Sequence, residues 1–396
     1  MESVELVVVG CGPAGATAAR EAARAGIETI VLEKDPVVGA QRVCAAGLRP
    51  GFCETFDLPR SLVHCDTPRL ALFDHQGTEH EVFFGPGHTT TREELDGTMG
   101  ALAAAEGAQV RTGALYRDVQ IEAGRLLVDY AERPGGARRR IAARNVFVAA
   151  GATARLERVF PFDHWTNGLM TTLQHRVYLD RPAAAIAYRT LELHYYSAAD
   201  GREIVAWMFP KRDHLAIGLG LLGKLPGQAL RAELHAFVER VRVRLFPGVA
   251  VREVKEEGHL LYGGRPRPAF ARDGVLVGGT AAGLVDATNG EGIFEAAMSG
   301  RYAAEAVLAE RSSPARAARR YAGWVGQRFS RRLAHRAKLM RFLERRPARY
   351  GVLFEQLANA SRFAEVLQKE DHERTVRDRL YLYGQALRFA MRATVG

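Results

Sequence analysis

Apolar and small residues at the start of the chain follow a strand, helix, strand pattern. Residues 6–9 read Leu-Val-Val-Val, as in a buried strand, and residues 16–25 are rich in alanine and long enough for a helix. Residues 29–32 form a second short apolar run that is suited to another strand. Together these segments predict a βαβ unit whose two strands are parallel.

The apolar pattern changes farther along the chain. Residues 165–222 alternate apolar and polar positions and contain many aromatic residues, which predicts an antiparallel sheet. Residues 274–304 read as a strand, two glycine-rich turns and a helix of small residues. After Pro314 apolar residues recur at helical spacing. We therefore expect a mixed α/β (α+β) fold with a Rossmann-like domain, an antiparallel-sheet domain and a C-terminal helical region.

The same patterns predict where these parts begin and end. The expected boundaries are 1–90, 140–165 and 270–310 for the Rossmann-like domain, 91–139 for a helix and strands joined to it, 166–269 for the antiparallel-sheet domain, and 311–396 for a basic helical region.

The turn between the first strand and the first helix predicts a dinucleotide site. It reads Gly10-Cys11-Gly12-Pro13-Ala14-Gly15, a GxGxxG pattern. In such a turn the first glycine makes the bend, the second lets backbone approach a pyrophosphate, and the third lets helix and strand pack closely. Glu33 ends the second strand, where its carboxylate can accept hydrogen bonds from ribose hydroxyls. Its negative charge disfavours the 2′-phosphate of NADP as this ligand.

A second glycine-rich turn indicates which dinucleotide is bound. Residues 286–293 read Asp-Ala-Thr-Asn-Gly-Glu-Gly-Ile and lead into a helix. The N-terminus of that helix would place N–H groups and a positive dipole end near the pyrimidine side of a flavin, where the reduced form carries negative charge. This arrangement favours FAD over NAD.

The two glycine-rich segments resemble those of the geranylgeranyl reductase family, within the p-hydroxybenzoate-hydroxylase-like class of flavoproteins. Further segments carry the likeness: Arg42-Val-Cys44-Ala45-Ala46-Gly47-Leu48, Phe56-Asp-Leu-Pro59, Thr91-Arg92-Glu-Glu-Leu-Asp96, Trp207-Met-Phe209-Pro210, Gly218-Leu-Gly220 and Ser299-Gly-Arg301. The resemblance implies an enzyme that uses reduced FAD to saturate carbon–carbon double bonds of an isoprenoid chain or a related terpenoid or lipid. Flavin N5 would supply a hydride, and an acid would supply a proton.

The resemblance also implies the residues of the site. The expected FAD contacts are Gly10, Gly12, Pro13, Ala14, Gly15, Glu33, Lys34, Arg42, Cys44, Ala45, Gly47, Arg92, Val119, Thr280, Gly283, Gly290, Gly292 and Ile293. Arg92 is expected at the site independently of the resemblance, because an arginine is a fixed cation that can pair with a phosphate. The expected substrate contacts are Tyr196, Trp207, Phe209 and Pro210, which would line an apolar channel.

Several positions depart from the family pattern. Thr280 and Ala150 stand where the family has aspartates, and Val205 stands where it has a tyrosine. Ala45 and Ala46 fill positions of glycines beside the flavin. The Gly10–Gly15 turn and Glu33 keep the complete dinucleotide-binding pattern, so FAD binding is still expected. Direct use of NADPH is in doubt, and the electron donor stays open between NADPH and a ferredoxin-like protein.

Saturation of an unpolarised alkene needs a positioned acid. Cys44 is the first candidate, because the resemblance puts it beside the flavin. The other candidates are Tyr195, Tyr196 and His194.

Two other chemistries remain open on the same fold. One is FAD-dependent monooxygenation (hydroxylation or epoxidation) of an apolar small molecule, and the other is a non-redox, flavin-dependent isomerisation or cyclisation. Halogenation is disfavoured, because halogenases of this class carry a lysine in a region where this chain has none, between Lys34 and Lys211.

The positive charge of the chain is concentrated near its C-terminus. The net charge is +10, and residues 301–396 hold 21 Lys and Arg against 9 Asp and Glu. Aromatic and apolar residues interleave with arginines at 321–346, a pattern that predicts either a helix on an anionic membrane surface or a packed helix with a solvated face. No nucleic-acid motif accompanies the charge, so a nucleic-acid partner is not expected.

Composition adds two expectations. The four cysteines form no CxxC pair and lie near no histidine at metal spacing, so no metal site is expected. The chain starts directly with a strand pattern and contains no run of 18 uncharged apolar residues. We therefore expect a cytoplasmic protein, with peripheral contact at the inner face of the membrane left open.

Overall fold

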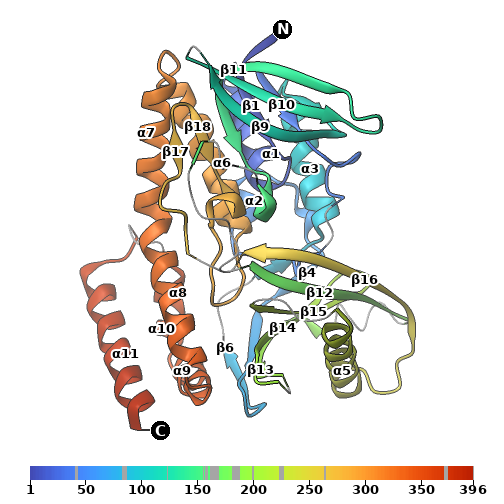
Figure 1. Cartoon of the computed structure of the whole chain (residues 1–396). Coiled ribbons are helices and arrows are strands. Elements are labelled where there is room, and N and C mark those ends of the chain that lie inside the picture. Colours follow the sequence, from blue (N-terminus) through green and yellow to red (C-terminus); the bar gives the residue numbers. More distant parts are fainter. Residues whose placement is uncertain are drawn as a thin grey trace.

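The computed structural model describes residues 1–40, 43–82, 87–122, 124–154, 156, 159–160, 169–180, 188–198, 200–222, 227–262, 265–369 and 373–395. Two large sheets lie one above the other, and a column of helices runs along both of them (Figure 1). This arrangement is the expected mixed fold with a Rossmann-like domain.

The first sheet has a parallel core. Its order is β17-β18-β11-β1-β2-β8, and the ribbon β9–β10 pairs onto β11. The strands are β1 (Glu2–Val9), β2 (Thr29–Leu32), β8 (Gln109–Arg111), β9 (Ala114–Glu122), β10 (Arg125–Glu132), β11 (Arg138–Val148), β17 (Ala271–Arg272) and β18 (Val275–Val277). The apolar run of β1 is buried at the sheet centre between β11 and β2, as a parallel sheet covered on both faces requires.

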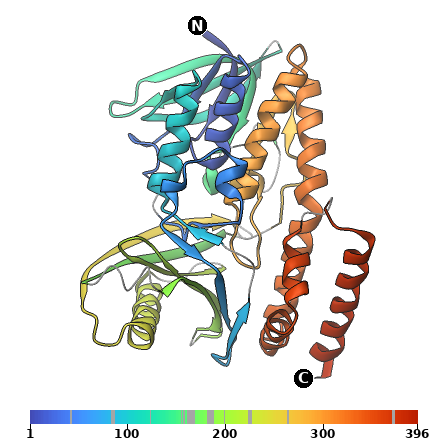
Figure 2. The ribbon, with the colours of Figure 1, turned by 180° about the vertical axis from the view of Figure 1, so that it is seen from behind.

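Helices α1 (Pro13–Arg24), α3 (Arg92–Ala105) and α6 (Ile293–Ala309) pack beside one another on this sheet (Figure 2). Small residues allow the close approach of α1 and α6. A Cβ atom added at Gly300 would lie 2.1 Å from the carbonyl oxygen of Ala14. The two glycine-rich segments, almost 300 residues apart in sequence, are therefore held side by side.

The second sheet has the order β16-β12-β15-β14-β13-β5-β6. Its strands are β12 (Leu169–Leu179), β13 (Thr190–Ser197), β14 (Glu203–Pro210), β15 (Leu215–Leu222), β16 (Val251–Tyr262), β5 (Arg69–Phe73) and β6 (Glu79–Val82). Helix α5 (Gly227–Leu245) covers one face through an apolar cluster with Met208 and Leu219. The opposite face, with Leu193 and Phe209, packs against the C-terminal helices.

One part of this sheet differs from the expected boundaries. We expected residues 1–90 in the Rossmann-like domain, but β5 and β6 belong to the second sheet, because β5 pairs in parallel with β13. Short strands carry no local signal of their partner, so pairing across more than 100 residues could not be read from the pattern.

A small sheet joins the two large ones. It consists of β3 (Gly47–Leu48), β7 (Gly87–Thr89) and β4 (Cys65–Thr67), and the short helices α2 (Phe52–Thr55) and η1 (Arg60–Leu62) lie beside it in sequence. Thr89 Oγ1 donates a hydrogen bond of 2.7 Å to the carbonyl oxygen of Pro210, at the end of β14. The small sheet thereby fixes the Cys44–Gly47 segment against the second sheet.

The C-terminal helices form the column seen in Figure 1. They are α7 (Pro314–Val325), the π-helical turn η4 (Gly326–Ser330), α8 (Arg331–Glu344), α9 (Ala348–Ala358), α10 (Ser361–Gln368) and α11 (Val376–Val395). Tyr321, Phe329 and Leu333 are fully buried against the first sheet and α6. Within the described ranges, none of the helices combines the length and the apolar character needed to cross a bilayer.

Candidate active site

The Gly10–Gly15 turn is shaped to receive a phosphate. Gly10 has φ +90°, and a Cβ there would lie 2.6 Å from the carbonyl oxygen of Ala149. A Cβ at Gly15 would lie 1.8 Å from the carbonyl oxygen of Gly10, so helix and strand could not pack with any larger residue. Among the described residues no side chain caps the start of α1 and its first turn holds no acid, which leaves its N–H groups available to an anion.

The Glu33 carboxylate is held at the mouth of this turn. Its two oxygens accept hydrogen bonds from the backbone N–H of Cys11, at 2.8 Å, and of Asp35, at 3.0 Å. These bonds fix the carboxylate beside the glycine turn, where the ribose of a bound dinucleotide is expected.

Arg92 and Asp96 form a buried ion pair beside Gly12. Arg92 Nε and Nη2 bond the two Asp96 oxygens at 2.8 and 2.6 Å, and a Cβ at Gly12 would lie 3.4 Å from Arg92 Nη2. Burial disfavours the charge of Arg92, but Asp96 and Cys44 outweigh it and raise its pKa. Burial also raises the pKa of Asp96, against the opposing effect of Arg92. A fixed cation thus lies where the pyrophosphate is expected.

The Cys44–Gly47 segment touches the end of β14. A Cβ at Gly47 would lie 2.8 Å from the ring of Phe209, so only glycine allows this approach. The Nζ atom of Lys211 donates a hydrogen bond to the carbonyl oxygen of Ala45. The N–H of Ala46 donates to Cys44 Sγ at 3.3 Å. Two segments that the family resemblance singled out therefore meet in space.

Lys211 is the functional candidate that sequence reasoning missed. Its side chain is 1% exposed, and burial, together with the charge of Arg176, lowers its pKa to about 7 against the opposing effect of Cys44. The signal that could have found it is its position directly after Pro210, at the end of the Trp207–Pro210 segment.

The position of the Trp207 ring is fixed by close packing on a glycine and by one hydrogen bond. A Cβ at Gly218 would lie 2.3 Å from its Cζ2 atom, so the bare backbone of β15 makes room for the ring. Trp207 Nε1 donates to Gln174 Oε1 at 3.0 Å. Arg176 lies on the same strand as Gln174 and forms ion pairs with Glu93 and Glu257, at 2.7 and 3.0 Å. These contacts link β12, β14 and β16 to the start of α3.

Buried charges surround the second glycine-rich turn. Gly290 has φ +74°, and α6 begins directly after Gly292. Glu295, in the first turn of α6, is fully buried and forms ion pairs with Arg49 and, at 2.7 Å, with Arg332. Two arginines thus offset a buried carboxylate at the start of the helix that is expected to face the flavin.

The remaining candidates lie on the two faces of the second sheet. Tyr195 O–H donates to the carbonyl oxygen of Thr288 at 2.7 Å, and its ring packs on Tyr350 and Phe354 of α9. This is the same face of the second sheet as Trp207 and Phe209. Tyr196 and His194 lie on the opposite face, against Phe237 of α5. The placement of Tyr196 therefore does not favour its predicted role in substrate binding.

Other predicted FAD contacts are scattered around the site. Thr280 lies in the short helix η3 (Gly279–Ala282), and Gly283 ends it with φ +71°. Val119 is buried within β9. Lys34 is exposed and pairs with Asp35 at 3.2 Å. Arg42 lies outside the described residues.

A cavity of about 570 Å³ opens between the end of β2 and strand β16. Its lining residues are Lys34, Asp35, Ala40, Val43, Lys255, Glu256, Glu257, Gly258 and His259. The lining is mostly polar, so this cavity differs in character from the apolar channel expected around Trp207 and Phe209.

The fold, the phosphate-binding turn with Glu33, and the second glycine-rich helix start define an FAD-dependent oxidoreductase. A family model described as FAD dependent oxidoreductase matches residues 5–72. Digeranylgeranylglycerophospholipid reductase 1 of Methanopyrus kandleri is 31% identical over 319 residues, which cover 77% of this chain and 80% of that protein. The chain belongs to the geranylgeranyl reductase family.

Two further comparisons agree. The chloroplastic geranylgeranyl diphosphate reductase of Oryza sativa subsp. japonica is 28% identical over 325 residues, which cover 77% of this chain but only 66% of the longer rice protein. The crystal structure of a geranylgeranyl bacteriochlorophyll reductase-like protein from Thermoplasma acidophilum matches with a TM-score of 0.66 at 22% identity and covers 96% of both chains. That structural likeness supports the fold.

Proposed function

We propose that this protein reduces carbon–carbon double bonds of a geranylgeranyl-type isoprenoid chain. The observation that carries the proposal is the contact between the Cys44–Gly47 segment and the end of β14, where Phe209 and Lys211 lie. It joins a cysteine, a buried amine and apolar side chains on one side of the glycine turn. The relatives whose names describe reduction of geranylgeranyl compounds support this substrate class.

The residues around the carboxyl ends of β1 and β2 fit FAD. The open N–H groups at the start of α1 would bind the pyrophosphate, with Arg92 as its cation, and Glu33 would bind the ribose. Bound FAD supplies the hydride chemistry. In this proposal the Ala45–Gly47 segment lines the flavin side of the pocket.

Cys44 is the proposed proton donor, with its proton on Sγ, and Lys211 is a positioning residue. Lys211 holds the Ala45 carbonyl and, because its pKa is near 7, can carry a proton next to Cys44 at neutral pH. Trp207 and Phe209 would hold the isoprenoid chain. They share an apolar cluster with Ala45 and with Phe354 of α9, so water is excluded from this side of the sheet.

An anaerobic flavin assay tests the proposal. The purified holoenzyme is reduced with dithionite under argon, geranylgeranyl diphosphate is added, and the flavin absorbance near its oxidised maximum is followed. We expect the absorbance to return without oxygen, because the alkene takes up the hydride. Return only after oxygen is admitted, with an oxygenated product, would show monooxygenation instead.

The electron donor is the finer part of the proposal. Ala150 in place of the family aspartate favours a ferredoxin-like protein over NADPH. Flavin reduction by reduced ferredoxin at a rate at least tenfold above that with NADPH supports this choice. The reverse order of rates contradicts it.

We also propose that the enzyme works at an anionic membrane surface, through helix α11 and not through residues 321–346. The apolar residues at 321–346 are used inside the protein, since Tyr321, Phe329, Leu333 and Met340 are buried. Helix α11 instead presents an apolar stripe to solvent. Its members are Val376, Leu380, Tyr383, Leu387 and Met391, and they are 48–73% exposed.

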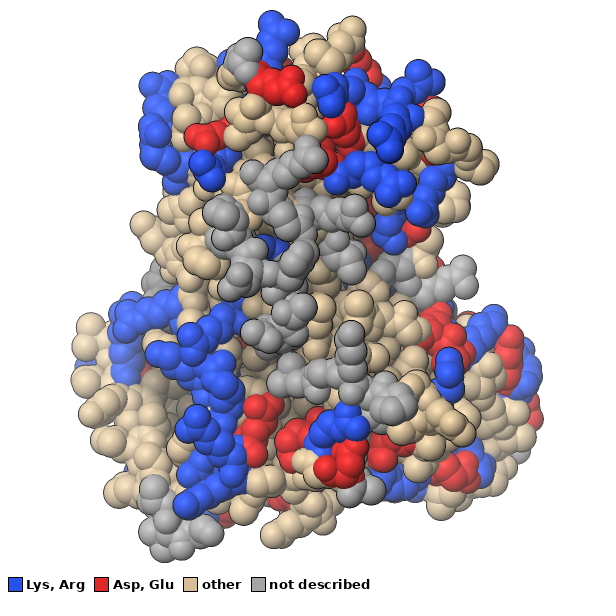
Figure 3. Space-filling model, viewed as in Figure 1, with Lys and Arg blue, Asp and Glu red and all other residues tan. Residues whose placement is uncertain are grey.

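The stripe has the form of an interfacial helix. At 100° per residue its five side chains lie on one face, with Arg377 and Arg388 along one border and Arg379 along the other. Figure 3 shows further Lys and Arg side chains gathered over the C-terminal helices. Arginines on both borders suit anionic lipid and would repel one another in a symmetric pair of α11 helices.

Vesicle flotation tests this contact. Wild type is expected to float with vesicles that contain phosphatidylglycerol and to remain in the bottom fraction with pure phosphatidylcholine vesicles. The double variant Leu380→Glu/Leu387→Glu should bind the anionic vesicles at least tenfold less. Val243→Glu is the matched control, because Val243 is 58% exposed on the distant helix α5. Equal flotation of the α11 variant, or a change only in its oligomeric state, contradicts the proposal and leaves the reductase assay unaffected.

A further inference from the structure

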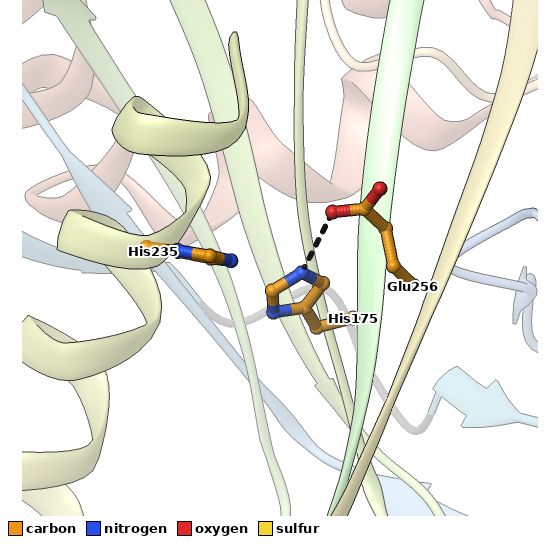
Figure 4. Close-up of side chains that lie close together, drawn as sticks. All are labelled: His175, His235 and Glu256. Atoms are coloured by element: carbon orange, nitrogen blue, oxygen red, sulfur yellow. Dashed lines mark hydrogen bonds and ion pairs between the residues drawn. The ribbon is translucent and has the colours of Figure 1, made fainter. Parts of the chain in front are cut away.

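We propose that His175, His235 and Glu256 bind a divalent transition-metal ion of the Zn²⁺ type. They lie where α5 packs over the β12 and β16 side of the second sheet, away from the residues proposed to hold FAD and the isoprenoid chain. Glu256 also lines the polar cavity beside β16. One ligand atom from each residue lies within 4.8 Å of the others. Figure 4 shows the three side chains pointing toward one another from three different elements. The cysteine spacing had given no hint of such a site, because its ligands are dispersed over 80 residues.

One ligand pair has a spacing that suits coordination. His175 Nε2 and Glu256 Oε2 are 3.4 Å apart. An N–H···O hydrogen bond is usually about 2.7–3.2 Å long. Two ligands of one tetrahedral zinc, each about 2.0–2.1 Å from the ion, are roughly 3.3–3.4 Å apart. The pair is therefore spaced as two corners of a zinc tetrahedron.

The third ligand would complete the site by rotation of an exposed side chain. The rings of His175 and His235 have centroids 5.1 Å apart and are tilted by 49°. His235 lies on the exposed surface of α5, so its ring can rotate toward the ion. His175 is buried and forms the fixed base of the site.

A neighbouring arginine orients the carboxylate ligand. Arg231 Nε donates to Glu256 Oε1 at 2.7 Å. This bond orients the carboxylate and leaves Oε2 directed at His175, as a supporting contact around a metal site does.

The donor set indicates the kind of ion. Two imidazole nitrogens and one carboxylate oxygen suit zinc, whereas calcium and magnesium prefer six or more oxygens. Three protein ligands leave a fourth position for water or an anion. Because the ligands come from α5, β12 and the edge strand β16, the ion would tie the helix and the edge strand to the sheet.

Zinc titration against a chromogenic chelator tests the site, with untagged holoenzyme at pH 7.5. We expect one Zn²⁺ per chain, with binding at least tenfold weaker in His235→Ala and unchanged in His335→Ala, because His335 is an exposed histidine on α8 outside the site. His235 is on the surface, so its variant should fold, and Glu256→Gln provides a second variant. Co²⁺ should give the intense visible bands of a four-coordinate site in wild type only.

Two results overturn the proposal. One is zinc binding by His235→Ala and Glu256→Gln as tight as by wild type. The other is no saturable binding by wild type at micromolar zinc. A gain in the melting temperature with Zn²⁺ but not with Mg²⁺ supports the structural role, because a ligand that binds only the folded state stabilises it.

Discussion

The Nζ atom of Lys211 donates a hydrogen bond to the carbonyl oxygen of Ala45, across 166 residues of sequence. The bond joins the end of β14, in the second sheet, to the segment that follows the dinucleotide-binding unit. A buried amine is thereby placed next to Cys44, and the interaction with Cys44 raises the pKa values of both Lys211 and Arg92. This contact is the basis for the first two predictions.

The first prediction concerns stability. Burial lowers the pKa of Lys211 from 10.5 to about 7 in the folded protein. Between these pH values the unfolded chain binds more protons than the folded one, so the free energy of unfolding should rise with pH across this window and stay flat below it. Relative to Lys211→Met, wild type should gain roughly 4 kcal/mol over the window. Denaturant titrations at a series of pH values measure this difference, and parallel curves for the two proteins contradict it.

The second prediction concerns activity. Since Lys211 loses its proton near pH 7, the turnover number for isoprenoid reduction should fall as the pH rises through this value. Lys211→Met should lower the turnover number at least tenfold and remove this limb of the pH profile, with little change in KM. A merely structural role for Lys211 would lower activity at all pH values alike.

Ala46 offers a test of backbone strain. It has φ +45°, in the left-handed region that costs a residue with a Cβ about 1–2 kcal/mol. Ala46→Gly removes that cost. Glycine also makes the unfolded chain more flexible, which lowers the free energy of unfolding by about 0.5–1 kcal/mol, so a net gain of about 0.5–1 kcal/mol in the free energy of unfolding is expected. Ala45→Gly is the control, because Ala45 has no positive φ and should only lose stability. If the two changes altered the free energy of unfolding equally, Ala46 would not be strained.

The two glycines of β15 should respond differently to alanine. At Gly218 the new Cβ would meet the Trp207 ring at 2.3 Å and the carbonyl oxygen of Leu173 at 2.8 Å. At Gly220 the nearest atom is a methyl group of Thr172 at 3.0 Å. Gly218→Ala should cost about 1–3 kcal/mol and displace the indole, while Gly220→Ala costs less. Chemical denaturation and the quenching of tryptophan fluorescence compare them; similar losses would argue against a seated Trp207.

FAD retention should require the planar guanidinium of Arg92, which can form two parallel hydrogen bonds, and not only its positive charge. Arg92→Lys keeps the charge but loses the paired bonds to Asp96 that hold the group beside Gly12, so FAD affinity should fall about tenfold. Arg140→Lys is the matched control, because Arg140 makes a similar pair with Asp129 on the surface. The flavin-to-protein absorbance ratio after gel filtration reports the result, and equal ratios contradict the role of Arg92.

Local sequence patterns predicted the parts of the site that depend on backbone shape. The Gly10–Gly15 turn and the start of α6 require glycine for close approach, and that requirement is visible in the sequence alone. Contacts that depend on sheet pairing were not predictable. The face of Tyr196 follows from the register of β13, and the burial of Lys211 follows from its encounter with Ala45. The basic helix at 331–344 showed an apolar pattern, but only packing reveals that this face is used inside the protein.

The most direct test of the central claim is the mass of the product. Reduced holoenzyme is incubated with geranylgeranyl diphosphate without oxygen, and the extracted isoprenoid is analysed by mass spectrometry. Reduction predicts a gain of two hydrogens for each double bond saturated. In deuterium oxide both should be deuterium, because the N5–H of chemically reduced flavin and the proton of the acid both come from the solvent. A product of unchanged mass, or one that forms only with oxygen and carries an added oxygen atom, would contradict the assignment.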